Sequence, residues 1–266
     1  MTTATRIALT LLALFAISIF AHAQLTQAGR EIQKLDQKSD QLQQQIQSLL
    51  AAKNLRPYDQ VMDEFLNAKT PDEQQRLSAE IRQIVAAWRD AEQVAKPESK
   101  KYLQLLLGLA YGTGAGIPRD PAEAARWLSK AADQNVPQAQ YILGTMYLEG
   151  DGVPKNTSKG VLLIQDAATQ NYADAQFHLG YLLQKGTIIP ANKEAAFNWF
   201  LKAAKQGHAK AQSMTARCYL TGEGIAKNTA ETIFWMQKAA EQGISEAQYV
   251  MGTFYDSGED EGIPRD

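Results

Sequence analysis

The sequence predicts an all-α protein, a right-handed α-solenoid of helix-turn-helix repeats with a helical region before them. Two observations lead to this prediction. A glycine-containing pattern returns at a fixed step of 36 residues, and a tryptophan-alanine pattern returns in phase with it. Self-similarity at a period of about 20 to 50 residues is typical of solenoids, whose repeats bury their apolar faces against one another.

The first pattern predicts the first helix of each repeat. A small residue stands in one column, and glycine follows six places later. The small residues are Gly108, Gly144, Gly180, Ala216 and Gly252, and the later glycines are Gly114, Gly150, Gly186, Gly222 and Gly258. Ala139 and Leu143 share a helix face with their small residue, so this face is expected to be buried. The later glycine is expected to end the helix, because a left-handed residue after the last turn is easiest without a Cβ.

The second pattern predicts the second helix. A short polar residue that can accept hydrogen bonds from a first turn opens it, at Asp120, Asn156, Asn192 and Asn228. Further along stand Trp127, Leu163, Trp199 and Trp235, each followed by a pair of alanines. The helix is expected to end at asparagine or glycine, the residues that tolerate positive φ, namely Asn135, Asn171, Gly207 and Gly243.

These residues resemble the Sel1-like repeat, a relative of the tetratricopeptide repeat. The shared pattern is A-x-x-x-L-G-x-x-Y-x-x-G-x-G-V, followed by a tryptophan-containing helix that closes on K-A-A-x-Q-G. The match covers four full repeats, from about Leu103 to Gln248, and the first helix of a fifth, within an expected repeat domain 98–266. Departures include Leu163 in place of tryptophan and Ile188 in place of a loop glycine. The resemblance implies a scaffold that binds peptides and partner proteins on its inner face.

The beginning of the chain predicts export. Arg6 precedes the apolar run Ile7–Phe20, and Ala21-His22-Ala23 supplies the small residues that a signal peptidase reads. We therefore expect residues 1–23 to be a signal peptide cleaved after Ala23, and the protein to be periplasmic or secreted. The alternative is a retained N-terminal anchor. Cys218 is the chain's single cysteine, so no internal disulfide can form.

Heptads follow in residues 24–53. Apolar residues alternate at spacings of three and four from Leu25 to Leu49, with Ser39 as the polar member of the seam. This pattern predicts a coiled coil that would make a homo-oligomer. The alternative is an amphipathic helix that lies on the chain's own solenoid.

Residues 54–97 are expected to be a helical region that caps the open edge of the first repeat. Thr70 and Pro71 indicate a helix start, and the helix is expected to run to about Val94. One side of this helix carries Leu77, Ile81, Ile84, Val85 and Trp88. The seam into the repeats is expected at Lys96–Lys101.

The last repeat is half built in this sequence. Gly262–Asp266 repeats Gly116–Asp120 without change, and the sequence stops at the capping position. We favour a truncated product over the alternative that the exposed side of the last helix meets another partner.

Composition argues against several functions. The net charge of −2 and the mixed charges disfavour nucleic acid as a partner. The sequence contains no metal-binding, phosphate-binding or hydrolase motif, so we expect no cofactor, no metal and no enzyme. Two alternatives stay open. One is a cell-envelope hydrolase or wall-modifying enzyme using His178 and Cys218, and the other is an oligomeric structural protein that acts through its coiled coil.

The helical wheel indicates where a partner would bind. Positions that point away from the buried face of the first helices form the predicted partner-binding groove. They are Tyr141, Thr145, Phe177, His178, Tyr181, Met214, Arg217 and Tyr249. Exposed aromatic residues with an arginine are common contacts in protein interfaces. The alternative is that these side chains serve contacts between neighbouring repeats.

Overall fold

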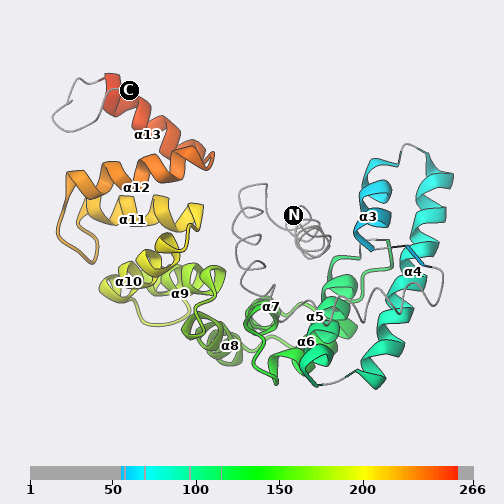
Figure 1. Ribbon diagram of the computed structural model, residues 1–266. Helices are drawn as coiled ribbons and strands as arrows, with labels where there is room; N and C mark the ends of the chain where they lie inside the picture. Colours follow the sequence, from blue (N-terminus) through cyan, green and yellow to red (C-terminus); the bar gives the residue numbers. More distant parts are fainter. Residues whose placement is uncertain (1–54, 57, 69, 96, 115, 257–266) are drawn as a thin grey trace. The chain divides into compact units, whose positions relative to one another are not determined.

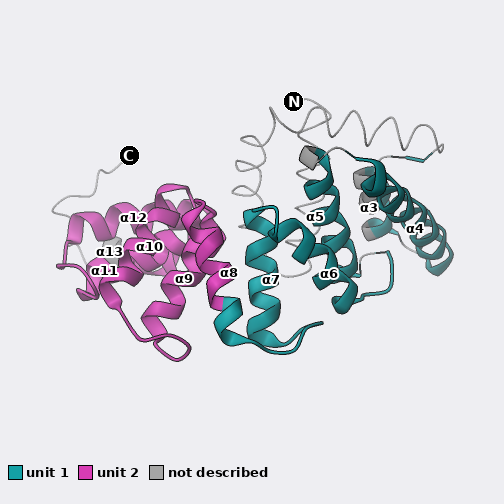
Figure 2. Ribbon diagram, turned by 90° about the horizontal axis from the view of Figure 1, so that it is seen from below, with its two compact units in different colours: residues 1–160 teal, residues 161–266 magenta. Residues whose placement is uncertain are grey.

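The computed structural model describes residues 55–256 apart from residues 57, 69, 96 and 115, and every regular element in this range is an α-helix (Figure 1). The prediction of an all-α repeat fold is confirmed. The predicted signal peptide, the heptads of residues 24–53 and the Gly262–Asp266 segment lie outside the described residues. The helices fall into two compact units, which meet in the sequence at Gly160 and Val161 and are described separately (Figure 2).

In its described part, the first unit contains two helices that precede the repeats and then the repeats' first hairpins. Its helices are α3 (Tyr58–Asn67), α4 (Pro71–Val94), α5 (Pro97–Thr113), α6 (Pro121–Ala132), α7 (Pro137–Glu149) and the start of α8 (Thr157–Thr169). Consecutive helices pack against each other from α3 through α7.

The second unit continues the same alternation of first and second helices. After the rest of α8 it contains α9 (Ala173–Lys185), α10 (Lys193–Lys205), α11 (Ala209–Thr221), α12 (Thr229–Glu241) and α13 (Ser245–Asp256). Consecutive helices pack against each other from α9 through α13. The odd-numbered helices from α5 onward are the first helices of their repeats, and the even-numbered ones from α6 are the second helices.

The predicted helix boundaries are confirmed, and each has a stereochemical cause. The side chains of Asp120, Asn156, Asn192 and Asn228 accept hydrogen bonds of 2.9–3.1 Å from the N–H three residues later. The backbone N–H of the same residues donates at 2.9–3.1 Å to a carbonyl of the first helix, as Asn192 does to Leu183. One residue therefore caps the second helix and holds the loop closed against the first.

The described helices end at the residues expected from the sequence, and Gly258 lies outside the described residues. Gly114, Gly150, Gly186 and Gly222 follow the first helices with positive φ, and Asn135, Asn171, Gly207 and Gly243 do so after the second helices. A further loop glycine, Gly224, has φ +74°, and a Cβ on it would lie 2.1 Å from the carbonyl oxygen of Lys193 at the start of α10. The loop of one repeat thus rests directly on the second helix of the repeat before it.

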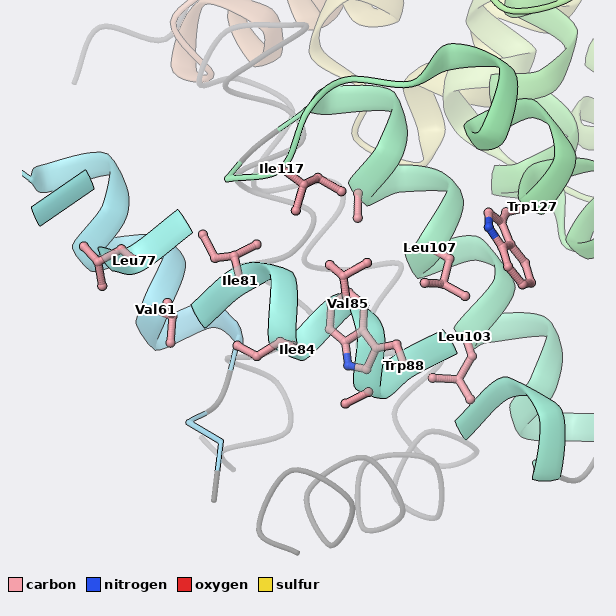
Figure 3. Close-up of a cluster of buried hydrophobic side chains, with 12 residues drawn as sticks. Val61, Leu77, Ile81, Ile84, Val85, Trp88, Leu103, Leu107, Ile117 and Trp127 are labelled. Atoms are coloured by element: carbon pink, nitrogen blue, oxygen red, sulfur yellow. The ribbon is translucent and has the colours of Figure 1, made fainter. Parts of the chain in front are cut away.

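The predicted capping helix α4 is confirmed in its start and in its buried side. Thr70 accepts a hydrogen bond of 3.2 Å from the N–H of Glu73, and Pro71 is the first helical residue. The predicted apolar side is buried against α3, α5 and the first repeat's loop (Figure 3). This core contains Val61, Leu77, Ile81, Ile84, Val85, Ala87, Trp88, Leu103, Leu107, Ala110, Ile117 and Trp127.

The expected seam at Lys96–Lys101 stays a prediction, and the structure shows that this segment is largely helical. Helix α5 begins at Pro97, so most of that segment forms the first turn of the first repeat's helix. Proline is tolerated there because the first helical residue has no N–H partner to lose. The packing of α4 on α5 supports the capping hypothesis, and the boundaries of domain 54–97 stay a prediction.

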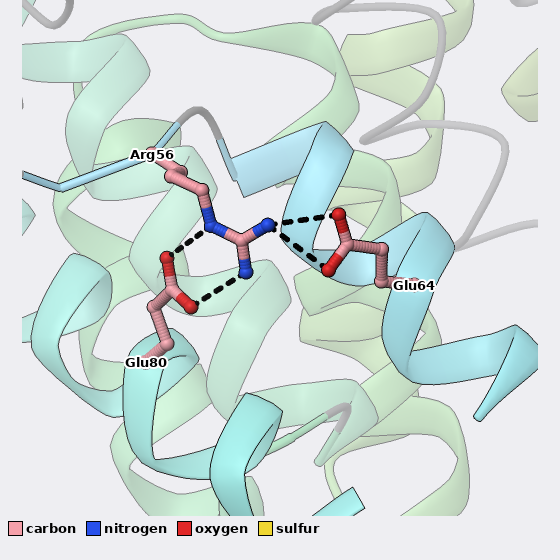
Figure 4. Close-up of polar contacts among 3 residues, drawn as sticks. All are labelled: Arg56, Glu64 and Glu80. Carbon is pink, nitrogen blue, oxygen red and sulfur yellow. Dashed lines mark hydrogen bonds and ion pairs between the residues drawn. The ribbon is translucent and has the colours of Figure 1, made fainter. Parts of the chain in front are cut away.

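An arginine just before α3 forms ion pairs with both α3 and α4. Arg56 donates through Nε and Nη2 to both carboxylate oxygens of Glu80 at 2.7 Å, and through Nη1 to Glu64 at 2.8 and 2.9 Å (Figure 4). The hydrogen bonds from Arg56 hold the pKa of the Glu80 carboxyl below its usual value. Such paired bonds fix orientation as well as distance, so Arg56 sets how α3 lies on α4.

Candidate protein-interaction surface

Buried glutamines position the first helices relative to one another in the second unit. Gln176, at the start of α9, donates to the carbonyl of Ala168 at 3.1 Å and accepts from Gln206 at 2.7 Å. The same arrangement recurs one repeat later, where Gln212 accepts from Gln242 at 2.7 Å. A buried polar group must be hydrogen-bonded to avoid a desolvation penalty, so these contacts fix the spacing of the repeats.

A similar arrangement of glutamines occurs in the first unit, where the first repeat meets the cap. Gln104 accepts from Gln134 at 2.6 Å and donates to the buried carboxylate of Glu92, also at 2.6 Å. Glu92 therefore supplies the acceptor that a backbone carbonyl supplies to Gln176. This network was not predicted from the sequence. The signal was the Ala-Gln pair that recurs at Ala139-Gln140, Ala175-Gln176, Ala211-Gln212 and Ala247-Gln248.

In the first unit the predicted partner-binding residues are half-buried on α7. They are Tyr141 and Thr145. The hydroxyl of Thr145 donates to the carbonyl of Ile142 at 2.7 Å, so its hydrogen-bonding capacity is partly used within its own helix.

In the second unit two of the predicted residues are well exposed. Tyr181 on α9 is 42% exposed, and Tyr249 on α13 is 75% exposed. The ammonium of Lys185 lies 5.4 Å from the centre of the Tyr181 ring. The attraction between a cation and an aromatic ring is weak at an exposed site. Tyr181 and Lys185 therefore both remain available to a partner.

A chain of hydrogen bonds connects Arg217 on α11 to α9. Its Nη2 donates to Oε1 of Gln184 at 3.4 Å, and Gln184 donates in turn to Glu223 at 3.1 Å. Glu223 also accepts from Lys193 at 2.9 Å, and this hydrogen bond is the main cause that lowers the pKa of its carboxyl. The charge of Glu223 is thereby compensated locally, mainly by Lys193 and to a smaller extent by Arg217, whose hydrogen bond goes to the neutral amide of Gln184.

Two residues outside the predicted groove, Lys185 and Leu220, extend this region into a patch. Leu220 stands three residues after Arg217 on α11 and is 44% exposed. We call Tyr181, Lys185, Arg217 and Leu220 the α9–α11 surface. Residues at i and i+3 or i+4 share a helix face, and the contact between Gln184 and Arg217 brings the two faces side by side.

Two other predicted residues serve contacts between helices. The Phe177 ring stacks on His208 with centroids 4.7 Å apart and lies 5.8 Å from Phe200. Met214 is half-buried against the cluster that contains Phe197 and Phe200. For these side chains the structure favours the alternative that our sequence analysis left open, namely packing between neighbouring repeats.

The pair proposed for an enzyme has unfavourable chemistry. Cys218 is 2% exposed, and burial raises the pKa of its thiol to about 11. A cysteine nucleophile acts as the thiolate, so this thiol is in its unreactive form at neutral pH. His178 is half-buried, and burial lowers the pKa of its imidazole.

Two further properties of the described residues bear on other functions. No group of three or more histidine, cysteine, aspartate or glutamate side chains with metal-binding geometry occurs among them. None of the helices described is both long and apolar enough to span a bilayer.

Comparisons with known proteins agree with this geometry. The family model described as Sel1 repeat matches residues 102–136, 137–172, 173–208, 209–244 and 245–266. From the second match onward, each range begins at the first residue of a first helix, at Pro137, Ala173, Ala209 and Ser245. A search of curated proteins found no match. Proteins built of Sel1 repeats are typically scaffolds for protein interactions.

Solved structures show the same fold. A Sel1 repeat protein from Oxalobacter formigenes is 30% identical, with a TM-score of 0.59, over 68% of this chain and 78% of that chain. The protein c5321, a protective antigen present in uropathogenic Escherichia coli strains, is 22% identical with a TM-score of 0.56, and the match covers 93% of this chain and 64% of that chain. The second likeness concerns the fold alone. Because the repeat pattern fills more than half of the sequence and its repeats coincide with the helical hairpins, the chain belongs to the Sel1 repeat family.

Proposed function

We propose that this protein is a non-catalytic scaffold of the bacterial cell envelope, which binds partner proteins or peptides along the exposed side of its first helices. The observation that supports the proposal most is the α9–α11 surface. It joins an exposed tyrosine and an exposed leucine to two cations on neighbouring helices. Interfaces are enriched in tyrosine and arginine at the residues that contribute most to binding.

The chemistry of the surface indicates the partner's chemistry. Lys185 and Arg217 contribute two positive charges, and the nearby Glu223 is already bound by Lys193 and Gln184. A partner segment with an apolar side chain between acidic residues would complement this surface. Its apolar side chain would contact Tyr181 and Leu220, and its carboxylates would approach the two cations.

The envelope location rests on the sequence of the N-terminus. The basic residue, the apolar run Ile7–Phe20 and the small residues to Ala23 predict a signal peptide, and export would place the repeats in the periplasm or outside the cell. Self-association through Leu25–Leu49 stays a prediction, as does the alternative of an oligomeric structural protein.

The proposal predicts which substitutions reduce partner binding. The protein without residues 1–23 is used to capture partners from an envelope extract of the bacterium that encodes it. The double variant Tyr181→Ala and Arg217→Ala is expected to retain less than about one tenth of the wild-type partner. Removing two interface residues that each contribute 1 kcal/mol or more would weaken binding by about this much.

A matched control comes from the second helices. Leu162 and Phe234 are 59% and 48% exposed, on α8 and α12, and the double variant Leu162→Ala and Phe234→Ala is expected to bind the partner as the wild type does. Thermal unfolding of each variant checks that it is folded. Equal binding by the Tyr181 and Arg217 double variant, or loss of binding in the control alone, would move the site away from the α9–α11 surface.

A further inference from the structure

His208 occupies a position where the other repeats carry apolar residues. The residue before each later first helix is Val136, Tyr172, His208 or Ile244. The side chains of Val136 and Tyr172 do not cap a backbone N–H of the helix that follows, whereas the imidazole of His208 does. His208 is 2% exposed, so a titratable group is buried at the junction of the third and fourth repeats.

The contacts of the imidazole fix which nitrogen carries the proton. Nδ1 accepts a hydrogen bond of 3.1 Å from the N–H of Ala211 in the first turn of α11. An accepting nitrogen has no hydrogen, so the neutral ring carries its proton on Nε2. Nε2 lies 3.2 Å from Oδ1 of Asp174 on α9, at ion-pair distance but without an aligned hydrogen bond.

Other charged and titratable groups surround this pair. Burial disfavours the charge of Asp174, but contacts with His208, Tyr172 and Lys210 outweigh that effect, and the pKa of its carboxyl lies below the usual value. Asp174 is therefore ionised near neutral pH and faces the imidazole as an anion. The ring face is covered by Phe177, which carries no charge.

A proton added to the neutral ring binds to Nδ1, because Nε2 already carries one. Nδ1 then becomes a donor and faces the N–H of Ala211, also a donor. The hydrogen bond that caps α11 is lost, and the new positive charge lies at the positive end of the helix dipole. At the same time the attraction to Asp174 grows, because a cation now faces the carboxylate.

We propose that His208 is a proton-sensitive joint between the third and fourth repeats, in which the neutral imidazole caps α11 and the imidazolium releases that cap and pairs with Asp174. The helices that meet at this joint, α9 and α11, also carry Tyr181 and Arg217. An effect of pH on partner binding would follow, and that consequence alone rests on the proposed function. The joint itself is tested without any partner.

The test is amide hydrogen exchange of the first turn of α11 in the full chain, corrected for the intrinsic pH dependence of exchange. Between pH 7.5 and pH 5, the protection of Ala211 and Gln212 in the wild type is expected to fall about fivefold, the equilibrium effect of losing a typical cap. In His208→Asn, whose side chain can cap the helix but has no titratable group, protection is expected to stay constant. His208→Ile introduces the residue that stands at the equivalent position before the fifth repeat, Ile244. This variant cannot cap α11 with its side chain and is expected to show low protection at both pH values.

Two results would overturn the proposal. One is protection in the wild type that does not change between pH 7.5 and pH 5. The other is an equal change in His208→Asn, which would assign the effect to another group. Asp174→Asn is expected to shift the loss of protection to lower pH, because the imidazolium loses its partner, and an unshifted profile would contradict the pairing with Asp174.

Discussion

Replacing Trp88 with alanine is expected to lower the free energy of unfolding of the first unit by about 3–5 kcal/mol. Trp88 is 1% exposed on α4 and belongs to the core that α4 shares with Leu103 and Leu107 of α5. Deleting the indole removes its apolar burial and leaves a cavity that the helices on either side cannot close without moving. The cap and the first repeat would therefore loosen together.

The measurement is hydrogen exchange of α4 and α5 under native conditions, since each unit can then be followed separately. Val94→Ala is the control, because Val94 is on the same helix and is 85% exposed. It is expected to change stability by less than about 0.5 kcal/mol. A loss below about 1 kcal/mol for Trp88→Ala would mean that α4 does not stabilise the first repeat.

The second large effect concerns the small-residue column of the first helices. A Cβ on Gly180 would lie 2.8 Å from two ring carbons of Phe200 and 3.1 Å from the carbonyl oxygen of Ala196. Gly180→Leu is therefore expected to destabilise the second unit by about 2–3 kcal/mol, since Phe200 is fully buried and the backbone of α10 cannot yield easily.

The chain offers a matched control in the same column. A Cβ on Gly252 would meet no atom of the described residues within 4 Å, and Gly252 is likewise inside a first helix. Gly252→Leu is expected to leave the second unit as stable or to stabilise it slightly, because leucine is the better helix former. The measurement is chemical unfolding of both variants. Equal losses of stability in the two variants would contradict this explanation, because the close approach of α10 would then not be the reason for a small residue at position 180.

The fold was predictable because each boundary depends on local stereochemistry. Asn192 caps its helix and Gly186 adopts positive φ whatever lies beyond the repeat, so a fixed spacing of such residues reveals the hairpin. The buried side of α4 was predictable for a similar reason, since Leu77, Ile81 and Trp88 follow the helical period.

The candidate surface was only partly predictable. The helical wheel gives the direction of a side chain from its own helix axis, and it does not say what the next helix brings against it. Phe177 and Tyr181 both point away from the buried column, yet His208 covers Phe177 while Tyr181 stays exposed. The roles of His208 and Asp174 were hidden as well, because they depend on a contact between residues far apart in sequence.

The measurement that tests the proposed function most directly is site-specific photo-crosslinking. A photoreactive amino acid is placed at Tyr181 on α9 or, as the comparison, at Phe234 on α12, and the protein is exposed to its captured partner. Both positions are exposed, at 42% and 48%, so accessibility alone does not distinguish them. A cross-link from position 181 and none from position 234 is the predicted result. A cross-link from position 234 and none from position 181 would contradict binding along the first helices.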